Sequence, residues 1–260
     1  MKIKKLTQNQ KTAVTSAVYP IFSLALIFAL WAITAAQTGS DLLIPSIGKT
    51  FEGLGALLSD KATYVDIAAT LLRALRGFVL SFAIALALSV AAAFLKPFAK
   101  ILAPIIAVMR STPTMSVILL CLLWTNTQIA PVFVTVLIIF PLLYTAFYSA
   151  ITGVDKKLTD MAKVYKVPFA TRLFKLYIPS ALPTVFSAVR STLSLTVKLT
   201  IAAEVLAQTK NSIGVDMQLA NLYLETPTLI AWTLIAIVLG ALLEIAVYAL
   251  GRLCMRWKNA

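Results

Sequence analysis

The sequence predicts an all-α membrane protein with about six transmembrane helices. Of its 260 residues, 60% are hydrophobic and only 13% are charged, whereas soluble domains typically carry about 25% charged residues. Apolar runs of about 18 residues or more recur along the chain, and as helices they are long enough to cross a hydrocarbon core of about 30 Å. Because lipid offers no hydrogen-bond partner to the backbone, such runs must be helical.

The first apolar segment lies at about 17–36 and follows a lysine-rich start. A cleaved signal peptide is the alternative for this segment. The apolar run from Tyr19 to Ala36 is long for a signal peptide, so a retained span is favoured. The further spans are expected at about 66–95, 101–124, 130–151, 180–207 and 228–250.

The distribution of Lys and Arg predicts that both termini lie in the cytoplasm. With the N-terminus inside, the inner segments carry most of the 23 Lys and Arg residues, and the outer segments carry only Lys49, Lys61 and Lys210. Cytoplasmic loops of membrane proteins are enriched in these residues. This bias also accounts for the net charge of +13, so no nucleic-acid partner is expected.

The length allows one transmembrane domain. We expect residues 1–65 to hold an N-terminal cytoplasmic tail, the first span and an outer loop, residues 66–250 to form the transmembrane core, and residues 251–260 to be a cytoplasmic tail. Histidine is absent, and Cys121 and Cys254 are far apart in the sequence. This pattern argues against a disulfide framework or a thiolate metal site.

The stretch 155–183 is a polar, basic island between apolar spans. Apolar residues recur in it at helical spacing, and Lys166-Val167-Pro168 interrupts them. Proline disfavours helical geometry in the residue before it and suits the first position of a new helix. The island therefore predicts two short cytoplasmic helices joined by a sharp bend. Such a pair is suited to docking on another protein, and an interfacial helix on anionic lipid is the alternative.

The spacing within this island resembles the cytoplasmic loop of the membrane subunits of bacterial ABC importers, the binding-protein-dependent permease family. That loop reads Glu-Ala-Ala, three residues, Gly, nine residues, then Ile-x-Leu-Pro. The corresponding positions here are Asp160, Met161 and Ala162, then Lys166, then Leu176, Ile178 and Pro179. Lys166 departs from the glycine, which permits a positive φ angle, and we expect Pro168 to enforce the bend instead.

Other stretches resemble one branch of that family, the permeases for nitrate, taurine, aliphatic sulfonates and related small solutes. The resemblance covers about 66–257. The stretches are Thr70-Leu71-Leu72-Arg73 with Gly77-Phe78, Met109-Arg110-Ser111-Thr112-Pro113 with Leu123-Trp124, and Ala202-Ala203-Glu204 with Ile213-Gly214.

The resemblance implies a type I ABC importer permease fold in the bacterial inner membrane. Two permease chains, expected to be a homodimer surrounded by lipid, would form one path. A cytoplasmic ATPase dimer would bind ATP and Mg, and an extracytoplasmic binding protein would deliver a nitrate-, sulfonate- or taurine-like anion, or a vitamin or pyrimidine precursor. No cofactor is expected in this chain. The coupling loop, 155–179, would contact the ATPase through Leu158, Asp160, Met161, Ala162, Tyr165, Lys166, Pro168, Phe169 and Pro179.

Polar residues within the spans are the candidates for lining the path. A charge at a helix centre costs about 2.5–3.5 kcal/mol on insertion scales, so these side chains should face the bundle interior or the seam between two chains. The candidates are Arg110, Trp124, Ser194, Lys198, Thr200 and Glu204.

Structural roles are the alternative for each candidate. The fifth-span residues are also suited to interhelical hydrogen bonds or to a pair between Lys198 and Glu204. Arg110 lies beside Pro113, which breaks a backbone hydrogen bond, and an internal ion pair would stabilise that kink. Trp124 is suited to an interfacial anchor.

The sequence indicates a transport protein without a catalytic site. It lacks the Gly-x-x-x-x-Gly-Lys-Ser/Thr loop that cradles nucleotide phosphates, so ATP hydrolysis is expected in a partner subunit. A secondary transporter driven by an ion gradient is the alternative function. That class usually shows repeated halves, and the basic island argues against it.

Overall fold

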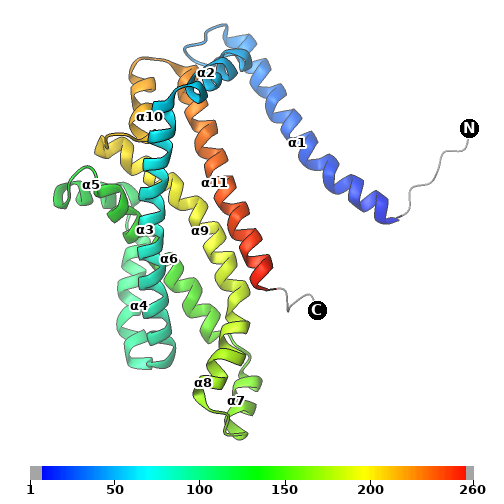
Figure 1. Cartoon of the computed structure of the whole chain (residues 1–260), viewed down its shortest axis with the longest axis vertical. Helices are drawn as coiled ribbons and strands as arrows, with labels where there is room; N and C mark the ends of the chain where they lie inside the picture. Colours follow the sequence, from blue (N-terminus) through cyan, green and yellow to red (C-terminus); the bar gives the residue numbers. More distant parts are fainter. Residues whose placement is uncertain (1–7, 256–260) are drawn as a thin grey trace, which may run out of the picture.

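The computed structural model describes residues 8–255, which contain helices and loops and no β-strand (Figure 1). In chain order the elements are α1 (Gln8–Thr38), α2 (Ile47–Ser59), α3 (Lys61–Phe94), α4 (Lys96–Ser111), α5 (Thr114–Trp124), α6 (Ala130–Thr152), α7 (Lys156–Val164), α8 (Phe169–Arg172), the π-helix η1 (Leu173–Tyr177), α9 (Ile178–Ala207), α10 (Ile213–Leu222) and α11 (Thr226–Cys254).

Within the described residues, four helical runs are long and apolar enough to cross a membrane: α3, α6, Phe169–Ala207 and α11. The prediction of one span at 101–124 is wrong in detail, because α4 and α5 meet there at a bend of 99° and qualify only as a pair. In α1 the apolar stretch Phe22–Thr38 is shorter than these spans. Residues 8–255 thus form a helical, multi-pass membrane domain with four such spans, or five counting the bent pair.

The core of the bundle lies where α6 packs between α3 and α9, with α11 against the other side of α9. Ile139, Leu143 and Phe147 of α6 are fully buried there. Gly77 permits the close approach of α3 to α6, because a Cβ atom at this position would lie 2.6 Å from Cγ2 of Thr135. Small residues commonly allow such contacts between helices in lipid.

The two ends of the bundle carry different short helices. Figure 1 shows α7 and α8 at one end, here named the α7 end, and α2 and α10 at the other, here named the α10 end. Side-chain oxygens start several helices by accepting backbone N–H groups that have no partner within the helix. Asp60 accepts from Ala62 at the start of α3, and Ser212 accepts from Val215 at the start of α10.

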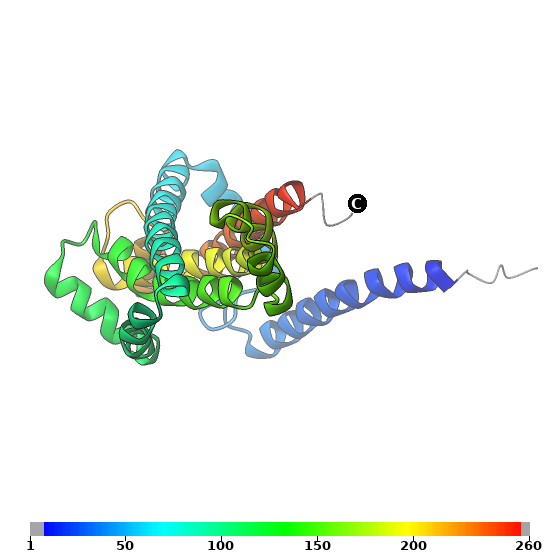
Figure 2. The ribbon, with the colours of Figure 1, turned by 90° about the horizontal axis from the view of Figure 1, so that it is seen from below.

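Helix α1 stands apart from the bundle in both Figure 1 and Figure 2. Its link to the rest of the chain is at the α10 end, where the indole N–H of Trp31 donates to the carbonyl of Pro45 at 3.0 Å. Large apolar side chains on it are exposed, including Phe22, Ile27 and Leu30. An apolar helix in this position requires lipid or another protein chain around it.

Candidate functional site

The basic island forms two short helices joined by a bend, as predicted. Asp155 caps α7 by accepting from the N–H of Lys157 at 2.8 Å. After α7 the chain turns at Lys166, which has a φ of 50°, and the next N–H, that of Val167, donates back to the carbonyl of Ala162 at 2.9 Å. This 6→1 bond with a left-handed residue is a common way to end a helix.

The expectation that Pro168 takes over the role of the family's glycine is therefore wrong. Lys166 itself adopts the left-handed conformation that glycine adopts without strain. Pro168 has a φ of −55° and stands immediately before α8, where it begins the second helix. The bend is made by the lysine, and the proline fixes the start of α8.

An apolar face of the island is uncovered at the α7 end. Leu158, Met161 and Tyr165 follow each other at helical spacing and are 43%, 54% and 76% exposed. Phe169 is half exposed, and Ala162 is buried on the other side of α7. Asp160 forms an exposed ion pair with Lys163 at 3.1 Å, which contributes little to stability. Apolar side chains at this spacing are suited to a groove on a partner protein.

Aromatic contacts attach this segment to the spans. The ring of Phe94, at the end of α3, lies 5.2 Å from that of Phe169 and 5.6 Å from that of Tyr177, both in edge-to-face geometry. The helix then continues from α8 through η1 into α9, where Pro179 is half-buried. Packed rings and a continuous helix therefore join α8 to α3 and α9.

One face of α9 is uncovered although α9 packs against α3, α5, α6, α10 and α11. Lys198 lies at the middle of this face and is exposed. A lysine facing lipid at mid-helix would be costly, so the face requires water or a second chain. The exposed residues, three or four apart, are Ser187, Ser191, Leu195, Lys198, Ala202 and Leu206.

The other fifth-span candidates lie inside the bundle. Ser194 is half-buried beside Gly240 of α11, where an added Cβ would lie 3.3 Å from the serine hydroxyl. Thr200 is fully buried, and its hydroxyl lies 3.1 Å from that of Thr135 on α6. For Thr200 the structure shows the interhelical hydrogen bond that was the alternative to lining the path.

Glu204 is fully buried and its ion pair is with Arg73 of α3, at 2.9 Å. The alternative pairing of Glu204 with Lys198 is therefore wrong. The second carboxylate oxygen accepts from the hydroxyl of Thr70 at 2.9 Å and from the N–H of Gly214 at 3.4 Å. Hydrogen bonds to both oxygens offset part of the cost of burying the charge.

The guanidinium of Arg73 also binds the connections at the α10 end. It donates to the carbonyls of Lys210 and Asn211, at 2.9 and 3.0 Å, and to the side chain of Gln128 at 3.2 Å. One side chain of α3 thus holds the turns before α6 and after α9. In the sequence Arg73 stands out only as part of a motif, and that motif does not indicate this role.

Gly214 allows α10 to pack directly on α9. A Cβ atom at this position would lie 2.6 Å from Cβ of Glu204 and 2.7 Å from the carbonyl oxygen of Ile201. No side chain fits in that space, which explains why glycine follows the turn here. The contact fixes α10 over the buried carboxylate.

The bend between α4 and α5 exposes two further candidates. Thr112 and Pro113 lie at the break, and the hydroxyls of Ser111 and Thr112 bond to the carbonyl of Val108 at 3.0 and 2.8 Å. Arg110 is exposed, and the ion pairs of residues 8–255 do not include it. Trp124 is 73% exposed at the end of α5. That Arg110 and Trp124 line the translocation path stays a prediction.

Two further carboxylate contacts join the helices. Glu244 of α11 accepts from Nε of Arg190 of α9 at 2.8 Å, and this ion pair joins the two helices. At the α10 end, Asp216 and Asp66 line the same cavity. Burial, with the nearby charge of Asp66, raises the pKa of Asp216 to about 7.

The chain is similar to a known protein family and to individual known proteins. A family model described as "Binding-protein-dependent transport system inner membrane component" matches residues 83–255. A probable ABC transporter permease protein of Brucella abortus is 27% identical over 230 residues, covering 88% of this chain and 91% of the relative. A putative aliphatic sulfonates transport permease protein of Escherichia coli is 29% identical over 238 residues, covering 90% and 89%.

A solved structure shows the same fold at low sequence identity. It is described as an amino acid ABC transporter with histidines, and it aligns with a TM-score of 0.60 at 16% identity. The alignment covers 75% of this chain and 95% of that chain.

Proposed function

The chain belongs to the family of binding-protein-dependent transport system inner membrane components, and we propose that two copies form the path of an importer for a small anion. As a permease subunit it serves an ATP-driven importer and is not itself the ATPase.

The uncovered apolar face of α7 is the observation that carries the contact with a partner ATPase. Leu158, Met161 and Tyr165 project at the end of a segment that Phe94 fastens to α3 and that continues into α9. In the orientation that the basic residues favour, this end lies in the cytoplasm with both termini. The segment is then a lever between a cytoplasmic ATPase dimer, which binds ATP and Mg, and the spans.

The exposed face of α9 supports pairing with a second copy. A helix with neighbours on most sides retains an uncovered stripe with Lys198 at its middle. If this stripe of α9 faces the same stripe of a second chain, the two stripes enclose a polar path between the chains. The exposed apolar α1 offers a second surface for that partner. An extracytoplasmic binding protein would then dock at the α10 end.

The solute class follows from Lys198 and the named relatives. A lysine in the path attracts anions, and the relatives from Escherichia coli and Bacillus subtilis are putative permeases for aliphatic sulfonates. A sulfonate-like anion is therefore the first solute to test, with nitrate, taurine and uncharged vitamin precursors as comparisons. If Lys198→Met leaves sulfonate uptake and its salt dependence unchanged, Lys198 does not line the path.

Co-purification tests the docking surface. The tagged chain, solubilised in mild detergent from cells that express its transport system, should retain an ATPase, and Tyr165→Arg should lose it. Tyr64→Arg is the matched control, because Tyr64 is also exposed, at 54%, and belongs to α3 near the α10 end. Loss of the ATPase from both variants, or from neither, contradicts docking at α7. Uptake that persists without ATP and collapses with the proton gradient would establish the secondary transporter instead.

A further inference from the structure

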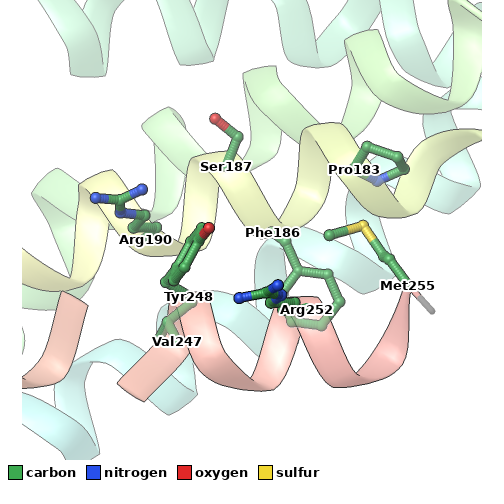
Figure 3. Close-up of a pocket in the computed structure, with 9 residues that line it drawn as sticks. Pro183, Phe186, Ser187, Arg190, Val247, Tyr248, Arg252 and Met255 are labelled. Carbon is green, nitrogen blue, oxygen red and sulfur yellow. The ribbon is translucent and has the colours of Figure 1, made fainter. Parts of the chain in front are cut away.

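A cavity of about 470 Å³ lies between α9 and α11 near the α7 end (Figure 3). Its polar lining consists of Ser187 and Arg190 from α9 and Tyr248 and Arg252 from α11. Apolar walls are supplied by Phe186 and Met255. Its volume is within the range of sites that hold small organic ligands.

The two arginines retain unused donors on the cavity side. Glu244 accepts from Nε of Arg190, and an arginine has further N–H groups on its two terminal nitrogens. The Arg190 guanidinium lies 5.2 Å from the ring centre of Tyr248, which holds it in place. Arg252 takes part in none of the ion pairs found within residues 8–255. Figure 3 shows Tyr248 between the two guanidinium groups.

The lining of the cavity suits an amphiphile better than a small hydrophilic anion. Tyr248 and Arg252 lie on a stripe of α11 that continues through Ala241 and Ile245 to Ile237, and all five side chains are exposed. The stripe is therefore basic at one end of the helix and apolar along the rest. Phosphate oxygens match the arginine donors, and acyl chains match the apolar part.

We propose that this cavity binds the phosphate headgroup of an anionic phospholipid from the cytoplasmic leaflet, between Arg190 and Arg252. Basic pockets between spans on the cytoplasmic side are suited to such headgroups. The proposal rests on the orientation given under the proposed function, which puts the α7 end in that leaflet. A bound headgroup would join α11 to the base of α9, which continues through η1 into α8.

Native mass spectrometry of the purified full-length chain tests this site directly. Phosphatidylglycerol should be retained at lower added concentrations than phosphatidylcholine. Arg252→Gln should weaken phosphatidylglycerol retention about tenfold, as expected for the loss of a charge-assisted hydrogen bond, and should leave phosphatidylcholine unchanged. Arg252 is exposed, so its replacement does not threaten folding. Lys100→Gln is the matched control, because Lys100 is an exposed cation of α4 outside the cavity.

The possible outcomes separate the sources of the ligand. Equal retention of the two lipids, or an equal loss from Lys100→Gln, overturns the site. Stabilisation by inorganic phosphate that depends on Arg252, without a preference for phosphatidylglycerol, assigns the cavity to a free anion instead. An oxidative cross-link between two copies through the exposed Cys254 shows that a second chain, and not a lipid, covers this face. None of these readouts involves an ATPase, so failure here is distinct from failure of the proposed function.

Discussion

Replacing Arg73 with methionine should destabilise the protein more than any exchange of an exposed arginine. Arg73→Met keeps a long apolar side chain and removes the guanidinium that pairs with Glu204. The carboxylate is fully buried, and the Arg73 side chain is only 11% exposed. After the exchange, Glu204 retains only the bonds from Thr70 and Gly214.

The expected loss follows from this burial. Removing one partner of a buried ion pair typically costs about 3–5 kcal/mol, because the other charge stays buried without compensation. The carbonyls of Lys210 and Asn211 lose their donor as well. At about 2–4 °C per kcal/mol for a chain of this size, the melting temperature should fall by about 6–20 °C.

A double-mutant cycle in detergent separates the pair from its surroundings. Adding Glu204→Gln to Arg73→Met removes both charges, and the double variant should lie within about 2 kcal/mol of the native protein. Arg76→Met is the control, because Arg76 is exposed one turn further along α3 and should cost less than about 0.5 kcal/mol. The stabilising role of the pair is refuted if Arg73→Met costs less than about 1 kcal/mol, or if the two exchanges are additive.

Three further exchanges test local features. Lys166→Gly relieves the left-handed backbone strain at this position, about 1–2 kcal/mol. The greater freedom of glycine in the unfolded chain offsets part of that gain, so the melting temperature should rise by a few degrees. An unchanged or lower melting temperature contradicts a strained turn. Gly77→Ala places a Cβ against Thr135 and should cost about 1–3 kcal/mol, whereas Gly48→Ala meets open space and should not lower the melting temperature. Asp216 has a pKa of about 7 in the folded protein, against 3.8 for the unconstrained group. Between these pH values the folded protein keeps a proton that the unfolded chain releases. Stability should therefore fall as pH rises from 4 to 7. Asp216→Asn should remove much of that fall in melting temperature, and an unaltered pH profile would contradict the assignment.

The sequence predicted the two short helices of the basic island well because their determinants are local. Helical spacing of apolar residues, the cap at Asp155 and the break at Lys166-Val167-Pro168 all act within a few residues of each other. The bend was nevertheless expected at Pro168, because the residue type alone does not reveal a non-glycine residue with a positive φ. The structure places that conformation at Lys166.

By itself the sequence determined that this is a helical membrane protein, approximately where its four long spans lie, and that a basic island of two short helices separates α6 from α9. These properties depend on composition and on short-range periodicity, which the sequence displays directly. Only the tertiary structure decided that Glu204 pairs with Arg73, 131 residues away, that α4 and α5 are bent by 99°, and that Arg190 and Arg252 share one cavity. Each of these depends on how helices far apart in sequence pack, and periodicity in one helix does not specify which neighbour its polar side chains meet.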